Sequence, residues 1–282
     1  MTAPHRLVAA ILALLPALSL FAQDFPRYGD ELYRPTLRQP GKDVMWLPTP
    51  DAMATRMLQA AKTTDKDLVY DLGAGDGKIP IAAAREFGAK AVGIEYDRQL
   101  AALAKRNAER AGVADKVTII QGDIFREDFS KATVVTLYLL PELNEQLRPQ
   151  LLRMKPGTRV VSHQWPMGEW EPDEIIRVDQ AEAYLWIVPA DVAGRWSLRD
   201  EQGSIDAMVE LDQQFQRIGG SITLRGKTQP LVGAFVNGAT IGFSFVAPDG
   251  GVRSVRGTID RDHLNGTIGF AGTATPVTGA RR

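Results

Sequence analysis

From Val69 to Asp97 the chain reads VYDLGAGDGKIPIAAAREFGAKAVGIEYD, a stretch that contains a strand, a glycine turn, a helix and a second strand. The apolar run Leu68–Leu72 is followed by three glycines, Gly73, Gly75 and Gly77. Because glycine has no Cβ, this turn can approach a ligand closely. A helix that begins near Gly77 or Lys78 would direct its free N–H groups into the same cleft, where they can bind a carboxylate or phosphate. The stretch therefore predicts a nucleotide-cofactor site in an open α/β sheet.

A carboxylate ends the second strand of this unit. Glu95 lies 24 residues after Asp71, where dinucleotide-type folds place an acid that accepts hydrogen bonds from ribose hydroxyls. The NAD fingerprint G-x-G-x-x-G requires its third glycine where this chain has Lys78, and the carboxylates of Asp71 and Asp76 would repel a pyrophosphate. The turn instead reads D-x-G-x-G-x-G, which resembles the first motif of class I S-adenosylmethionine (SAM)-dependent methyltransferases. The sequence therefore favours SAM over NAD, and a turn that only packs strand against helix is the remaining alternative.

The resemblance implies a set of cofactor-binding residues. In that family the acid and the glycines of the first turn surround the methionine moiety, and an acid after the third strand accepts a hydrogen bond from the adenine amino group. The third strand is expected at Val117–Gln121, so Asp123 is predicted to bind adenine, although an aspartate here can also cap a turn or helix. Asp97 is expected to cap the helix that follows the second strand. The implied cofactor-binding residues are Asp71, Gly73, Ala74, Gly75, Gly77, Glu95, Tyr96, Asp123 and Ile124.

Four further segments narrow the resemblance. They are Trp46-Leu47-Pro48-Thr49-Pro50, Leu139-Leu140-Pro141, Val160-Val161-Ser162-His163 and Trp170-Glu171-Pro172-Asp173. With the first turn, they make the chain look like a bacterial relative of the lysine methyltransferases that act on the mitochondrial ATP synthase c-subunit and the adenine nucleotide translocase. The similarity runs from about Asp43 to Val188. The chain departs from the family pattern at Ala74, Lys78 and Pro80, so the cofactor carries over more directly than the protein substrate.

The residues after the fourth strand are expected to form the channel for methyl transfer. That strand is predicted at Thr133–Leu139; Tyr138 would shape the channel, and Leu140 and Pro141 would flank the sulfonium. Methyl transfer chiefly needs an acceptor lone pair held in line with the S–CH3 bond, so no general base is assigned. His163, at the end of the fifth strand, is a further candidate for substrate contact; the alternative is a histidine satisfied at the sheet edge.

The expected acceptor is a protein lysine, and its amine must arrive neutral, which an apolar slot favours. An apolar rim would suit the aliphatic stem of a lysine that enters from a membrane-associated partner. The rim residues would be Trp46, Tyr138, Trp165 and Trp170, with ordinary packing as the alternative. Two other functions stay open: methylation of a small molecule, and a catalytically idle SAM-fold module whose β-domain binds a ligand.

Composition argues against a nucleic-acid substrate. With 33 Lys and Arg against 34 Asp and Glu, the chain has no excess of positive charge to follow a phosphate backbone. It contains no Cys, which excludes disulfides and thiolate metal sites, and its three His are too scattered in sequence to suggest a metal site.

The first residues resemble a secretory signal. His5 and Arg6 precede the apolar run Leu7–Leu20, which contains Pro16 and is shorter than the roughly 20 residues of a membrane span. Residues 1–22 are therefore predicted to be a signal peptide, which would make the protein periplasmic or secreted. The alternative is a cytoplasmic protein anchored by an uncleaved N-terminal segment.

Two domains are expected after that segment. Residues 23–48 would form an arm over the cofactor site, and alternating strand and helix patterns over 49–189 predict a Rossmann-like, seven-stranded methyltransferase sheet with an antiparallel last strand. From Gly194 onward the chain holds 15 of its 26 glycines, which predicts a small antiparallel all-β barrel or sandwich over 190–272. Within it, Gly219-Gly220 and Asn265-Gly266 are expected as turns, Gln214–Ile218 as a strand, and residues 273–282 as a disordered tail. The junction Val188–Val192 is expected to be open to proteases.

Overall fold

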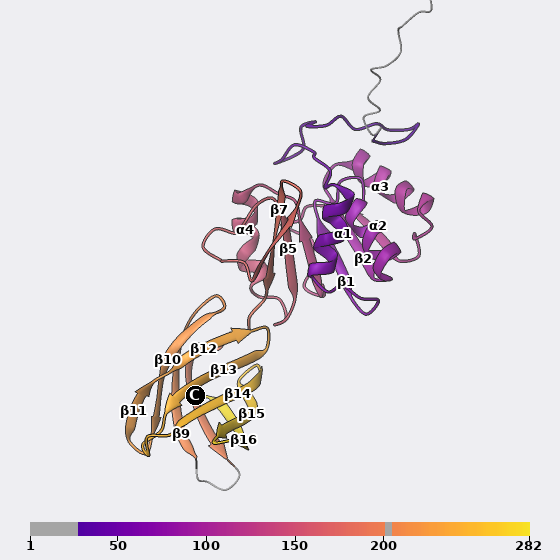
Figure 1. The fold of residues 1–282 in the computed structure, drawn as a ribbon. Helices are drawn as coiled ribbons and strands as arrows, with labels where there is room; N and C mark the ends of the chain where they lie inside the picture. Colours follow the sequence, from indigo (N-terminus) through magenta and orange to yellow (C-terminus); the bar gives the residue numbers. More distant parts are fainter. Residues whose placement is uncertain (1–27, 201–204) are drawn as a thin grey trace, which may run out of the picture.

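The computed structural model describes residues 28–200 and 205–282 and shows two sheets arranged end to end (Figure 1). The predicted signal peptide lies outside the described residues. Within those two ranges, no helix has the length and apolar character needed to cross a membrane.

The first sheet has the seven strands expected from the sequence, in the order β3-β2-β1-β4-β5-β7-β6. All neighbours from β3 to β5 are parallel, whereas β7 pairs antiparallel with both β5 and β6. Its elements are α1 Asp51–Ala60, β1 Leu68–Leu72, α2 Lys78–Phe87, β2 Lys90–Glu95, α3 Arg98–Arg110, β3 Val117–Gln121, β4 Val134–Leu137, α4 Pro141–Leu151, β5 Arg159–His163, β6 Glu174–Val178 and β7 Ala181–Ile187. This α/β domain confirms the predicted Rossmann-like sheet of seven strands with an antiparallel seventh strand.

Local sequence explains where the helices around the site begin. Gly77 adopts a left-handed conformation (φ +84°) just before α2, and a Cβ there would lie 3.0 Å from the Cβ of Ala104 on α3. Asp97 caps α3 as expected, because its Oδ1 accepts hydrogen bonds from the backbone N–H groups of Gln99 and Leu100, both at 2.8 Å. Both helix N-termini are thereby fixed beside the ends of β1 and β2.

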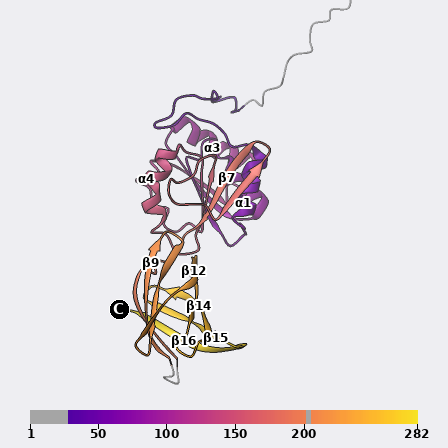
Figure 2. The same ribbon diagram turned by 60° about the vertical axis from the view of Figure 1, so that its left-hand side comes forward.

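The N-terminal arm is held on the α/β domain by ion pairs between the buried Asp30 carboxylate and two partly exposed arginines. Asp30 accepts hydrogen bonds from the guanidinium of Arg106 on α3, at 2.6 and 3.1 Å, and from that of Arg110 at 3.2 Å. Tyr28 packs edge-on against Trp46, with ring centroids 5.3 Å apart. The described part of the arm therefore lies across the carboxyl ends of the parallel strands (Figures 1 and 2).

The second sheet, here called the β-domain, is an antiparallel meander of nine strands that returns on itself where β16 pairs with β8. Its strands are β8 Gly194–Asp200, β9 Asp206–Gln214, β10 Arg217–Leu224, β11 Lys227–Pro230, β12 Val232–Asn237, β13 Thr240–Val246, β14 Val252–Asp260, β15 His263–Phe270 and β16 Thr273–Arg281. Strand β12 at one edge of the sheet lies against β10, next to the other edge strand β11, so the sheet nearly closes into a barrel. Large apolar side chains fill its core, among them Trp196, Phe243 and Phe245.

Several sequence expectations for the β-domain are wrong. Residues 273–281 are not a disordered tail but strand β16, which pairs with both β15 and β8. Gly219-Gly220 and Asn265-Gly266 lie inside β10 and β15 rather than in turns. A Cβ on Gly266 would come within 2.4 Å of the Arg256 carbonyl oxygen, so this glycine serves close strand contact. The expected strand Gln214–Ile218 is interrupted at Phe215 and Gln216, which form the turn between β9 and β10; Phe215 has φ +54°.

The junction between the sheets is buried rather than open. Val188 and Val192 have no exposed surface. The side chain of Gln213 accepts a hydrogen bond from the Val192 N–H at 2.7 Å and donates one to the Ala190 carbonyl at 2.9 Å. The Ala190 N–H donates to the Gly238 carbonyl at 2.8 Å. The Val188 N–H donates to the Thr158 carbonyl of the first domain at 2.9 Å. This backbone is therefore held by both domains and offers no ready site for a protease.

The segment Trp170-Glu171-Pro172-Asp173 forms the main contact with the β-domain. The Trp170 ring is fully buried and stacks on Phe215 of the β9–β10 turn, with centroids 6.2 Å apart. Glu171 forms an ion pair with Arg217, and its carbonyl accepts a hydrogen bond from Gln216 at 2.6 Å. The expectation that Trp170 belongs to an apolar rim of the active site is therefore wrong. The β-domain lies at the end of the first sheet opposite the arm (Figures 1 and 2).

Candidate cofactor and methyl-transfer site

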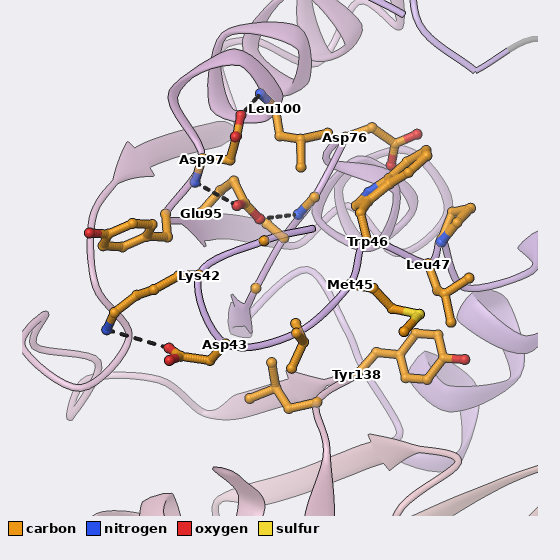
Figure 3. A pocket seen from close by; sticks show the side chains of 18 of the residues that line it. Lys42, Asp43, Met45, Trp46, Leu47, Asp76, Glu95, Asp97, Leu100 and Tyr138 are labelled. Carbon is orange, nitrogen blue, oxygen red and sulfur yellow. Dashed lines mark hydrogen bonds and ion pairs between the residues drawn. The ribbon is translucent and has the colours of Figure 1, made fainter. Parts of the chain in front are cut away.

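A pocket opens at the carboxyl ends of β1, β2 and β4, beneath the N-terminal arm (Figure 3). It is lined by the first glycine turn, the ends of those strands and the arm segment from Gln39 to Thr49. Most of the residues proposed from sequence for the cofactor lie here: Asp71, Gly73, Ala74, Gly75, Glu95, Tyr96, Asp123 and Ile124.

The glycine turn has a backbone that other residues would strain. Gly73 and Gly75 have φ of +87° and +56°. The N–H groups of Gly73 and Ala74 both donate to the Ile94 carbonyl at 2.9 Å, which ties the turn to β2. A Cβ on Gly75 would lie 2.8 Å from Nε1 of Trp46, so this glycine allows the arm to pack against the turn.

Glu95 is fixed at the centre of the pocket by the backbone. Its two carboxylate oxygens accept hydrogen bonds from the N–H groups of Gly75 and Asp97, each at 2.8 Å. The side chain is buried, and this burial raises the pKa of the carboxyl despite those hydrogen bonds. Each oxygen keeps a lone pair free for the ribose hydroxyls that the sequence assigns to it.

Three acids make the methionine end of the pocket attractive to a cation. Asp71 is buried, and Thr136 donates a hydrogen bond to its carboxylate at 2.6 Å. Burial raises the pKa of Asp71 to about 7; the Thr136 hydrogen bond opposes this shift, and the charges of Glu95 and Asp76 add to it. Burial also raises the pKa of Asp76. A ligand that brings positive charge, as the sulfonium and ammonium of SAM do, would relieve the repulsion among these carboxylates.

Lys78 adds a basic group at the N-terminus of α2. Lys78 lines the pocket, and its ammonium lies 2.8 Å from the Asp51 carboxylate. A lysine at a helix N-terminus can bind an anion together with the free N–H groups. Lys78 is therefore placed to hold the carboxylate of the methionine moiety.

Asp123 lies at the other end of the pocket and has two local partners. Its Oδ1 accepts a hydrogen bond from the N–H of Phe125 at 3.0 Å, and its Oδ2 pairs with Lys42 of the arm at 3.0 Å. These two interactions, in that order, lower the pKa of Asp123. The Lys42 ammonium also lies 5.1 Å from the centroid of the Tyr96 ring. Asp123 therefore stabilises its own turn, as the alternative interpretation holds, while it also lines the predicted adenine end.

Of the residues proposed for methyl transfer, Tyr138 lines the pocket, whereas Leu140, Pro141 and His163 do not. Tyr138 lines the pocket at the end opposite Lys42, beside Met45 and Leu47 (Figure 3). Leu140 is exposed at the start of α4, and neither it nor Pro141 lines the pocket; the walls are formed by Leu139 and Leu143. The side chains separate because the chain turns from β4 into α4 at this point. His163 is 3% exposed and lies behind Tyr138 rather than in the pocket.

Sequence reasoning missed some lining residues and misassigned Gly77. Gly77 does not line the pocket, and its missing Cβ instead allows α2 to approach Ala104. The main additions are Lys42, Asp43, Met45, Pro48, Thr49, Asp76, Lys78, Ile79, Leu100, Leu139 and Leu143. The segment Trp46–Pro50 carried a usable signal, because it belongs to the family resemblance although it precedes the first strand. Among the residues that the structure describes, no three His, Asp or Glu side chains gather as a metal site.

Comparison with known proteins identifies the family. The model of the ANTKMT methyltransferase domain matches residues 71–174. A protein-lysine N-methyltransferase of Saccharolobus islandicus is 44% identical over 151 residues, which are 51% of this chain and 94% of the relative. The chain belongs to this methyltransferase family.

Further relatives agree with that assignment. A solved RNA methyltransferase from Salinibacter ruber in complex with S-adenosylhomocysteine is 50% identical, with a TM-score of 0.51 over 52% of this chain and 96% of that one. The mouse lysine N-methyltransferase of the ATP synthase c-subunit is 36% identical over 106 residues, 37% of this chain but only 42% of the relative. The protein is a methyltransferase, and its cofactor is SAM. The matched residues 71–174 lie wholly within the α/β domain, so the family assignment does not extend to the β-domain.

The geometry of this methyltransferase fits the cofactor. The acids Asp71 and Asp76 and the basic Lys78 suit the charged methionine end of SAM, and Glu95 suits its ribose. The arm covers the pocket from Gln39 to Thr49, which limits the access of water to the sulfonium.

Proposed function

We propose that this methyltransferase transfers the SAM methyl group to the ε-amino group of a lysine in a protein. The proposal rests on the relative from Saccharolobus islandicus, a protein-lysine N-methyltransferase that this chain covers almost completely. The relatives named for the ATP synthase c-subunit and for the adenine nucleotide translocase are also lysine N-methyltransferases. In the transfer, the amine lone pair attacks the methyl carbon, the S–CH3 bond breaks, and S-adenosylhomocysteine leaves.

The surroundings of the transfer end support an amine with an aliphatic stem. Tyr138, Leu139 and Pro48 line this end, and burial raises the pKa of the Tyr138 phenol, so the phenol stays neutral. A desolvated slot of this kind favours a neutral amine, which is the form that can attack. The positioning of the amine accounts for catalysis, since the sulfonium is already activated.

We further propose that the partner presenting the lysine is apolar near the target, as a membrane-associated protein would be. Large apolar side chains are exposed around or near the arm and the start of α4: Leu37, Met45, Leu47, Leu140 and Trp165. Single exposed apolar residues are common, but Met45 and Leu47 of this group also line the pocket that must bind a substrate. The formal net charge of −1 gives little reason to expect a nucleic-acid substrate.

Transfer of labelled methyl groups tests the proposal. The protein is incubated with SAM carrying a labelled methyl group and with separate membrane-protein, soluble-protein, RNA and small-molecule fractions. We expect label in a protein of the membrane fraction, resistant to nuclease and located on lysine by mass spectrometry. Asp71→Ala should abolish the signal. Because the Salinibacter ruber relative is an RNA methyltransferase, label confined to RNA would overturn the proposal, as would label confined to small molecules.

The location of the protein stays a prediction from the first 22 residues. We propose export through a cleaved signal peptide, and the mass of the N-terminal peptide from natively expressed protein tests it. Cleavage after Ser19 or Ala22 is the expected result. An intact N-terminus would favour the uncleaved anchor instead.

A further inference from the structure

Three segments that are far apart in the sequence meet behind the transfer end of the pocket. Thr49 precedes α1, Tyr138 follows β4, and His163 ends β5. The rings of Tyr138 and His163 are in contact, with centroids 4.1 Å apart and planes inclined at 48°. Nδ1 of His163 lies 3.2 Å from Oγ1 of Thr49. Together they form a row, Thr49–His163–Tyr138, of which the first and last members line the pocket.

The burial and protonation state of this row suit it to restrict the motion of the Tyr138 ring. Thr49 and His163 are 5% and 3% exposed, so neither can exchange its partner for water easily. Burial lowers the pKa of His163 to about 4, and the imidazole is therefore neutral at physiological pH. A neutral imidazole places no charge beside the pocket. The contact of His163 with the Thr49 hydroxyl fixes the orientation of the imidazole ring.

We propose that His163, oriented by Thr49, is a positioning residue that fixes the Tyr138 ring against which the methyl acceptor is aligned. The inference deepens the proposed function and rests on it, because it assigns the fixed ring to the path of the lysine amine. His163 does not touch the acceptor itself. It acts through Tyr138, since in-line transfer is sensitive to displacements of about an ångström in the groups that position the reactants.

Matched variants of Thr49 test this on the full-length protein. Thr49→Val keeps the shape and removes the hydroxyl, whereas Thr49→Ser keeps the hydroxyl; His163→Phe keeps an aromatic ring and removes both nitrogens. We expect Thr49→Val and His163→Phe to lower kcat about 10-fold or more, with calorimetric Kd for SAM within about twofold of wild type. Thr49→Ser should restore most of kcat. Equal kcat for the valine and serine variants would overturn the proposal.

The acceptor in these assays is the fraction that the wild-type protein labels. If that acceptor is not a lysine, the proposed function is refuted, but the variant series still tests the positioning role.

A second measurement needs no acceptor at all. With 13C-labelled tyrosine rings, the Tyr138 resonance is identified by its loss in Tyr138→Phe. We expect Thr49→Val to shift that resonance and Thr49→Ser to leave it near its wild-type position. A Tyr138 resonance unchanged in Thr49→Val would show that the ring is held without the row, and would overturn the proposal even if no transfer were found.

Discussion

The two ends of the seven-stranded sheet both carry motifs of the family resemblance, but one end forms a pocket and the other forms a contact with the β-domain. At the carboxyl ends of the parallel strands, the motifs leave a pocket with buried acids, among them Asp71 and Glu95. At the opposite end, Trp170 and Phe215 close a dry contact with the β-domain. Aromatic and acidic residues occur at both ends, so residue type alone does not tell a site from an interface. What distinguishes them is that Asp71 and Glu95 are buried and form no ion pair with a described residue, whereas Glu171 at the domain contact is exposed and paired with Arg217.

This comparison predicts that residues at the contact with the β-domain contribute to the stability of the fold and not to cofactor binding. Trp170→Ala should lower the free energy of unfolding by about 3–5 kcal/mol, because it removes a fully buried ring between Trp186 and Phe215. Thermal and denaturant unfolding measure this loss, and calorimetry at a temperature where the variant is folded should give an unchanged Kd for SAM. Trp165→Ala, at a ring 37% exposed, is the matched control and should cost about 1 kcal/mol or less. A large loss of SAM affinity in Trp170→Ala would mean that the two ends are not independent.

At the pocket end the expected effect is on binding. Glu95→Ala should weaken SAM binding by about 1–3 kcal/mol, because the ribose loses its acceptor and the N–H groups of Gly75 and Asp97 lose theirs. Isothermal titration calorimetry measures the change, with Glu171→Ala at the domain contact as a control that should bind SAM like wild type. Unaltered affinity in Glu95→Ala would remove Glu95 from the ribose site.

A buried acid without a cationic partner also predicts a pH dependence. The pKa of Asp71 is raised from its ordinary value of 3.8 to about 7, so between these two pH values the folded protein without cofactor holds a proton there that the unfolded chain does not. Its stabilising contribution is fully present below the unfolded pKa near 3.8 and is lost as the pH rises through about 7. SAM favours the ionised form, so its affinity should rise by at most about 10-fold per pH unit up to about pH 7 and then level off. Titrations between pH 5.5 and 8 check this, and Asp71→Asn should flatten the profile.

The sequence predicted the α/β domain well because its signals are local. Gly73 and Gly75 have the positive φ expected of the turn, Asp97 caps α3 as expected, and Glu95 ends β2 as expected, while its binding to ribose stays a prediction. The positions of Trp170 and His163 could not be predicted in this way, because burial depends on what packs over them. Trp170 is covered by a turn 45 residues later, and His163 by Thr49 from before the first strand.

The β-domain shows the same limit more strongly. Its glycines indicate turns when the sequence is taken alone, yet Gly257 and Gly266 are paired across β14 and β15, where their missing side chains let two backbones come close. Strand β16 follows β15 through a tight hairpin, but its other neighbour, β8, lies far earlier in the sequence, and only the closing of the meander pairs these two strands. Non-local pairing is the information that a glycine pattern lacks.

The smallest expected effect is that of removing the exposed Arg217–Glu171 ion pair, which lies in the same domain contact as the buried Trp170 ring. Arg217 and Glu171 form an ion pair with side chains 68% and 62% exposed, so water and salt screen their attraction. Arg217→Ala should therefore change the free energy of unfolding by only about 0–1 kcal/mol, far less than Trp170→Ala, although both lie in one domain contact. Denaturant unfolding at low and high salt measures the difference, which should shrink further at high salt. A loss comparable to that of Trp170→Ala would mean that the domain contact depends on the ion pair, and that the apolar stack of Trp170 on Phe215 is not what holds the β-domain in place.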